Sequence, residues 1–119
     1  MRNFRELEIW KRGIELVKEV YQLIDNFPKM ERYGLSSQIS RSAVSIPSNI
    51  AEGCSRESQK DFSRFLQIAL GSSYELETQL LISKDLGYIE IEPYSNCMDK
   101  LSELQKSINS LKKYADSKS

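Results

Sequence analysis

The chain has 119 residues, which is enough for one domain with a core of its own. Lysine plus arginine and aspartate plus glutamate both number 17, so the formal net charge is zero. A dedicated nucleic-acid or anionic-membrane binder usually carries a clear basic excess, and this chain has none.

The first predicted helix covers residues 7–26 and carries two neighbouring apolar stripes. The first stripe recurs every three or four residues, as in a helix packing seam, and comprises Leu7, Trp10, Ile14, Val17, Tyr21 and Ile24. The second stripe lies beside it and comprises Ile9, Leu16, Val20, Leu23 and Phe27. Together the two stripes give an apolar face wider than one packing contact in a four-helix monomer needs, and Trp10 and Tyr21 of the first stripe are expected in the core. Pro28 ends the helix, because the residue before a proline avoids the helical region.

The second predicted helix covers residues 34–52 and contains an interior proline, Pro47. An interior proline removes a backbone hydrogen bond at a cost of about 3 kcal/mol, so packing must hold this helix in place. Its seam consists of small and branched residues, namely Ile39, Ala43, Ile46 and Ile50. We therefore expect a central, buried helix that its neighbours approach closely, with Gly53 as a left-handed cap.

The third and fourth predicted helices cover residues 59–86 and 93–115. Ser58 and Asp61 form a variant of the capping box before the third helix, and Gly87 is placed to end it. The middle of the third helix, residues 69–73, is rich in small side chains and is expected to pack closely on the serine-rich second helix. Its seam comprises Phe62, Leu66, Ala69, Ser73, Leu76, Leu80 and Ser83. Pro93 suits the first position of the fourth helix, whose seam is Tyr94, Cys97, Leu101, Leu104, Ile108, Leu111 and Ala115.

Four amphipathic segments joined by short connections predict antiparallel neighbours. The expected fold is all-α, an up-down-up-down four-helix bundle forming a single domain over residues 1–119. No run approaches the roughly 18 apolar residues of a membrane span. With Cys54 and Cys97 at no metal or redox spacing, we expect a cytoplasmic protein whose cysteines act as small hydrophobes.

The sequence offers little for catalysis. It has no histidine, the commonest general base and metal ligand, and no glycine-rich phosphate loop. Glu75 and Glu77 are two residues apart and so point to different sides of a helix. We expect no catalytic residue, no metal and no cofactor, and hence a non-enzymatic protein.

Two polar groups are candidates for binding. Asn49 and Glu52 share a helix face near Pro47 and form either a ligand-binding cluster or caps for the helix end. A basic strip near the turn between the second and third helices is either a phosphate-binding patch or a solvated surface, since acidic residues are interspersed. The strip consists of Arg41, Arg56, Lys60 and Arg64.

The stretch Ser45–Gly53, read Ser-Ile-Pro-Ser-Asn-Ile-Ala-Glu-Gly, resembles the signature of four-helix-bundle proteins encoded in bacterial 23S rRNA intervening sequences. The resemblance extends over residues 4–114, through the blocks Phe4–Leu7, Trp10–Lys11, Arg64–Ser72, Glu75–Leu80 and Leu86–Tyr88. It implies a ring-shaped homopentamer. It also implies kinship with accessory proteins of diversity-generating retroelements, which bind nucleic acid and contact a reverse transcriptase. Those relatives are markedly basic, whereas this chain is neutral.

Two functions are consistent with these patterns. The first is a homo-oligomer that binds RNA or a nucleic-acid-processing partner. The second is a scaffold that contacts protein only and uses its uneven charge, acidic over 75–92 and lysine-rich over 100–119, for self-association. In a ring each subunit meets two neighbours through different surfaces. The outward residues predicted to supply these contacts are Ile9, Leu16, Leu23, Ile68 and Ile82.

Overall fold

The computed structural model describes residues 2–119, and over that range the chain is helical with no strands. Its α-helices are α1 (Glu8–Ile24), α2 (Leu35–Cys54), α3 (Gln59–Asp85) and α4 (Ile91–Ser117). Two short 3-10 turns, η1 (Phe4–Glu6) and η2 (Lys29–Glu31), precede α1 and α2. The all-α prediction of four helices is confirmed.

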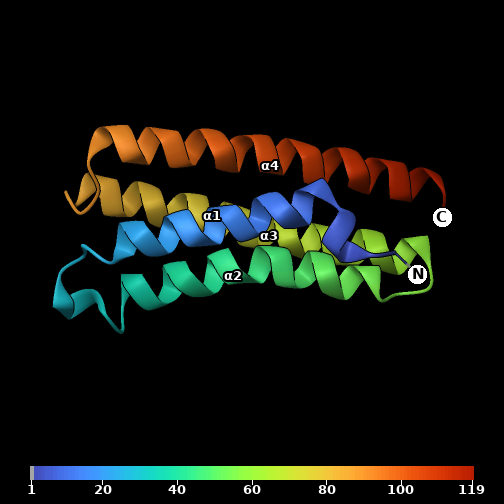
Figure 1. Ribbon diagram of the computed structural model, residues 1–119, viewed down its shortest axis with the longest axis horizontal. Helices are drawn as coiled ribbons and strands as arrows, with labels where there is room; N and C mark the ends of the chain where they lie inside the picture. Colours follow the sequence, from blue (N-terminus) through green and yellow to red (C-terminus); the bar gives the residue numbers. More distant parts are fainter. Residues whose placement is uncertain (1) are drawn as a thin grey trace.

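The helices lie side by side along the long axis of a molecule measuring 45 × 24 × 20 Å. Successive helices run in opposite directions in Figure 1, and α1 and α3 each pack on both α2 and α4. Both chain termini and the α2–α3 connection lie at one end of the molecule. The α1–α2 and α3–α4 connections lie at the other end.

Two helix ends form as the sequence predicts. The Ser58 hydroxyl accepts a hydrogen bond from the backbone N–H of Asp61 at 3.0 Å, which caps α3. At the far end of α3, Gly87 adopts a φ of 82°, and its N–H donates to the Lys84 carbonyl at 2.9 Å. The N–H of Tyr88 donates to the Ser83 carbonyl at 2.9 Å, completing a Schellman motif.

Two other helix ends differ from the prediction. Gly53 is not a left-handed cap, because α2 continues to Cys54 and Gly87 is the one positive-φ residue within 2–119. A Cβ on Gly53 would lie 2.8 Å from the Cβ of Phe65, so this glycine permits close contact between α2 and α3. Helix α4 begins at Ile91, two residues before Pro93, whose missing N–H costs nothing within a first turn.

The predicted seams of α2 and α3 are buried, and the predicted seam of α4 supplies its buried residues, with Tyr94 and Leu111 partly covered. Serines contribute to this core as well as apolar residues. The Ser73 hydroxyl, which is fully buried, donates to the Leu70 carbonyl at 2.6 Å. The Ser45 and Ser72 hydroxyls lie 2.8 Å apart and join α2 to α3. Buried hydroxyls with partners let these two helices approach without leaving an unsatisfied polar group.

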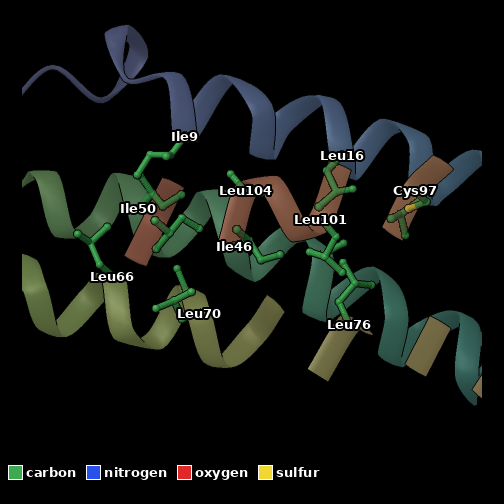
Figure 2. Packing of buried hydrophobic residues seen from close by; sticks show 14 of the residues in the cluster. Ile9, Leu16, Ile46, Ile50, Leu66, Leu70, Leu76, Cys97, Leu101 and Leu104 are labelled. Atoms are coloured by element: carbon green, nitrogen blue, oxygen red, sulfur yellow. The ribbon is translucent and has the colours of Figure 1, made fainter. Parts of the chain in front are cut away.

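Both stripes of α1 contribute to the core. The second stripe is the more deeply buried, since Ile9, Leu16 and Val20 are covered, whereas Tyr21 of the first stripe is 49% exposed. Four other residues of the first stripe are partly buried against the core, namely Leu7, Trp10, Val17 and Ile24. Figure 2 shows Ile9 and Leu16 pointing into the bundle, toward residues of α2 and α4. Because both side chains are covered within one chain, the prediction that they face outward is incorrect.

Helix α2 passes through Pro47 as one continuous α-helix, and the proline ring is buried. Gly13 of α1 lies against this ring, and a Cβ on Gly13 would be 3.2 Å from the Cβ of Pro47. The absence of a side chain at position 13 therefore allows α1 to approach the proline. Packing against α1 is the compensation that an interior proline requires.

Candidate nucleic-acid interface

Three residues of the predicted basic strip lie at the α2–α3 turn. Arg56 follows the end of α2, while Lys60 and Arg64 lie one turn apart in the first part of α3. Arg56 pairs with Glu52 at 3.1 Å, and Arg64 is 3.8 Å from Asp61. Lys60 forms no ion pair with any residue in the described part of the chain. Among the described residues, the turn therefore carries one free cation and two partly neutralised ones.

Both arginines of the turn lie on the same aromatic ring. The guanidinium carbons of Arg56 and Arg64 lie 4.7 and 4.8 Å from the centroid of Phe65. Cation–π contacts of this kind hold the planar guanidinium groups in place. The Nε of Arg56 is buried and has no hydrogen-bond partner within 2–119. Held arginines lose less side-chain freedom when they bind a phosphate.

Residues near both chain termini lie beside the cations of the α2–α3 turn. The side chains of Lys60 and Lys118 line one cleft of about 750 Å³, together with Asp116. The Ser63 hydroxyl donates to Asp116, and this hydrogen bond, with an ion pair to Lys112, lowers the pKa of the carboxyl group. We use the name "basic end" for Arg56, Lys60, Arg64 and Lys118. Arg2 lies beside it, with its guanidinium carbon 3.9 Å from the centre of the Phe62 ring.

Arg41 does not belong to the basic end. It is exposed on α2, separated from Arg56 by roughly 20 Å along the helix. It instead lines a cleft between α2 and α3 with Glu75. The prediction that Arg41 joins the other three cations near the turn is therefore wrong, because Arg41 lies in the first part of α2 and the turn follows its end.

Asn49 and Glu52 do not form one cluster. The Asn49 amide donates to the carbonyl and to the hydroxyl of Ser45, at 2.8 and 2.9 Å. Glu52 pairs with Arg56, and its carbonyl accepts the Ser55 hydroxyl at 2.6 Å. The Asn49 amide thus bonds one turn back within α2, beside Pro47, while the Glu52 side chain pairs with Arg56, so neither side chain caps the end of α2.

The described residues include two buried free cysteines. No cluster of three or more His, Cys, Asp or Glu within 2–119 could hold a metal ion. Burial raises the pKa of Cys54, and burial together with Glu19 raises the pKa of Cys97 to about 12. Both thiols are thus kept in the protonated, weakly nucleophilic form. No helix in the described part of the chain is long and apolar enough to cross a membrane.

The sequence did not reveal the role of Glu31. Its carboxylate accepts the backbone N–H of Leu35 at 3.1 Å and the Tyr88 hydroxyl at 2.9 Å. It therefore caps α2 and ties the α1–α2 connection to the α3–α4 connection. Only the position of Tyr88 in space shows this link, because the two residues lie 57 positions apart.

Fold and surface together define a small all-helical protein of the four-helix type, with cations gathered at one end. The model of the family described as 23S rRNA-intervening sequence protein matches residues 5–110, and the chain belongs to this family. The predicted resemblance is therefore confirmed.

Solved structures agree with this assignment. The chain is similar to a crystal structure of a protein with unknown function from the S23 ribosomal protein family of Bacteroides thetaiotaomicron. The two share 29% identity with a TM-score of 0.79, and the match covers 88% of this chain and 98% of the other. No curated protein matches the chain.

Proposed function

We propose that this protein is a non-enzymatic, self-associating bundle that binds nucleic acid through its basic end. The observation that supports this most directly is the cleft that Lys60 shares with Lys118, beside the two arginines on Phe65. Cations from two helices converge there, and lysine and arginine side chains are the usual ligands of backbone phosphates.

Binding by a single copy is expected to be weak. Glu52 and Asp61 pair with Arg56 and Arg64, Asp116 lines the cleft of the two lysines, and the chain as a whole has no net charge. Several copies in one assembly would hold several such surfaces near one nucleic acid, which raises the effective concentration of each. Self-association is therefore part of the proposal, with a homopentamer as the expected form.

The same ion pairs favour a second candidate function. A scaffold that contacts only protein would need no free cations, and Arg56 and Arg64 are already paired within the chain. In that case the uneven charge of the surface would serve contacts between proteins.

Fluorescence anisotropy with a structured ribosomal RNA fragment separates the two functions. The variant Lys60→Glu/Lys118→Glu should bind at least ~10-fold more weakly than the unmodified protein, about 1.4 kcal/mol. The control Lys18→Glu/Lys29→Glu makes the same change in net charge on residues outside the basic end and should bind almost normally. Equal losses in both variants, or no binding by the unmodified protein, would contradict the proposal.

A further inference from the structure

The cleft between α2 and α3 is lined only by polar and charged side chains, although the two helices pack on each other through apolar seams. The volume of this cleft is about 410 Å³. Ser45, Ser72 and Glu75 line it, and they belong to three of the sequence blocks that carry the family resemblance. The proposed function uses none of these residues, so the cleft requires an explanation of its own.

Ser42, on the α2 side of the cleft, is a buried serine whose hydroxyl has no partner among the described residues. Ser42 is 7% exposed, and its hydroxyl forms no hydrogen bond with any residue within 2–119. Buried polar groups are nearly always paired, so this hydroxyl points to a partner that enters the cleft from outside. The other buried serines of the described chain all form hydrogen bonds through their hydroxyls, namely Ser63, Ser72, Ser73 and Ser83.

Gln79, on the α3 side of the cleft, presents an unsatisfied acceptor. Its side-chain oxygen is buried and has no donor within the described residues. An amide oxygen only accepts hydrogen bonds, so the missing group must be a donor. Ser42 and Gln79 together give the cleft two polar groups that a bound ligand can satisfy.

Two opposite charges lie in the same cleft without pairing. The Ser45 and Ser72 hydroxyls join α2 to α3 at 2.8 Å, and the two helices run in opposite directions. Arg41 and Glu75 each lie about one turn from this hydrogen bond on the same side of it, so they lie at one level of the cleft. Neither forms an ion pair or a side-chain hydrogen bond with any residue within 2–119.

We propose that this cleft binds a free α-amino acid as its zwitterion. The Arg41 guanidinium pairs with the carboxylate of the ligand. The ammonium group of the ligand donates to the Glu75 carboxylate, to the side-chain oxygen of Gln79 and to the hydroxyl of Ser42. An ammonium group has three donors, and these three acceptors match that number. Hydrogen bonds between charged groups are the strong ones, and they also fix the direction in which the ligand binds.

Ligands with a single charge suit the cleft less well. An inorganic anion on Arg41 would lie near the carboxylate of Glu75, and a simple cation on Glu75 would lie near the guanidinium, so each would meet a like charge. A neutral ligand would leave both charges without a partner. An α-amino acid carries both charges on one carbon and therefore satisfies both side chains. The proposal is independent of nucleic-acid binding and of self-association.

Thermal unfolding in the presence of each standard L-amino acid at millimolar concentration is the first test. A ligand that binds only the folded chain raises Tm as its concentration rises. At least one L-amino acid should raise Tm. Its N-acetyl and carboxamide derivatives, which lack the ammonium and the carboxylate respectively, should not. A Tm unchanged by every L-amino acid would overturn the proposal and leave the cleft to water alone.

Charge-neutralising variants show whether the ligand lies in this cleft. Arg41→Gln and Glu75→Gln should each raise the Kd of the ligand at least ~10-fold, because each removes one charged partner. The controls Arg32→Gln and Glu103→Gln make the same changes at exposed residues that do not line the cleft, and they should bind normally. Equal losses in both pairs, or no loss in the first pair, would overturn the proposal.

Ser42→Ala tests the unpaired hydroxyl. Its removal breaks no hydrogen bond in the free chain, so the unfolding free energy of the free chain should not fall, while binding of the ligand should weaken. Nitrogen-15 NMR locates the ligand independently, since the side-chain amide signals of Gln79 should shift when it binds. The side-chain amide of Gln105, which donates to Glu77 at 3.0 Å, should keep its signals. Normal binding by Ser42→Ala without a shift at Gln79 would place the ligand elsewhere and overturn the proposal.

The outcomes are distinct from those of the proposed function. Arg41→Gln and Glu75→Gln should leave both the affinity for RNA and the mass of the assembly unchanged, because the cleft lies outside the basic end. Two residues predicted to contact another chain, Ile68 and Ile82, are 40% and 44% exposed and do not line the cleft, whereas Leu23 is partly buried against the core. A changed mass in Arg41→Gln, with no amino acid bound by the unmodified protein, would assign the cleft to a second copy and overturn the proposal.

Discussion

At the scale of single residues, Gly53 shows how closely α2 and α3 approach. Alanine at this position would place a Cβ 2.8 Å from the Phe65 Cβ and 3.3 Å from the Phe62 ring. Gly53→Ala should therefore lower the free energy of unfolding by about 1–3 kcal/mol from overpacking. A gain of roughly 1 kcal/mol in helix propensity offsets only part of this loss. Urea denaturation measures the change, and a more stable variant would show that the contact yields easily.

Cys97 makes stability depend on pH in the alkaline range. Its pKa is about 12 in the folded chain because of burial and Glu19, and 9.0 is the ordinary value. Between these values the unfolded chain has lost a proton that the folded chain keeps. This contribution is therefore complete below pH 9 and falls as pH rises toward 12, by about 1.4 kcal/mol per unit.

Cys97→Ala removes this contribution and should flatten the decline in unfolding free energy above pH 9. Comparing urea denaturation curves of the variant and the unmodified chain separates the effect of this thiol on the unfolding free energy from that of the other groups that ionise at alkaline pH. Parallel curves for the two proteins would contradict the assigned pKa.

At the scale of the helices, Glu31 joins three elements through one carboxylate. Glu31→Ala removes the cap of α2 and the acceptor for Tyr88, and should lower the unfolding free energy by about 1–3 kcal/mol. Tyr88→Phe removes only one of these hydrogen bonds and should cost less, and the double variant should cost less than the sum of the two. Strict additivity in this double-mutant cycle would mean that the two side chains do not interact.

The same hydrogen bond affects the titration of Tyr88. Its hydroxyl donates to Glu31, which raises the pKa of the phenol above its ordinary value of 10.0. The folded chain thus holds this proton more tightly, and the gain in stability is lost as pH rises above the ordinary value. Ultraviolet titration should show a late phenolate in the unmodified chain that moves down in Glu31→Ala. An unchanged titration would contradict the link.

The helices could be predicted from sequence, but the inward face of α1 could not. Three helices each have one dominant seam, and the seams of α2 and α3 are buried as predicted. Helix α1 has two apolar stripes of similar strength, and the more deeply buried one lies on the side where Gly13 meets Pro47. In the hydrophobic pattern Gly13 is only a gap, whereas in the structure it is the contact with Pro47. Which stripe is buried depends on α2, so the pattern of α1 alone cannot show it.

The candidate site was predictable only in part for a related reason. Arg56, Lys60 and Arg64 are close in sequence and lie on one turn, so local spacing found them. Lys118 joins Lys60 only because α4 returns to the start of α3. Arg41 leaves the group because an intact helix separates it from Arg56. The small residues 69–73 in the middle of α3 predict a close contact with α2. The sequence does not show that Gly71 takes no part in that contact.

At the scale of the whole molecule, the basic end lies beside both termini. The connections at the opposite end carry both signs of charge, with Asp25, Glu31, Asp85, Glu90 and Glu92 beside Lys29, Arg32 and Lys84. The distance between the ends approaches the 45 Å length of the molecule, well beyond the ~8 Å over which salt screens charges in the cell. The acidic residues of the opposite end therefore do little to weaken phosphate binding at the basic end. A net charge of zero thus does not exclude phosphate binding at one end.

The most direct test of nucleic-acid binding is the salt dependence of the affinity for a structured RNA fragment. The logarithm of the association constant should fall linearly with the logarithm of salt concentration, with a slope of about 0.9 for each duplex phosphate contacted. Lys60→Glu/Lys118→Glu should reduce the slope by about two contacts per binding surface. An affinity that does not change with salt, or an absence of binding at low salt, would contradict the account and favour a scaffold that contacts protein only.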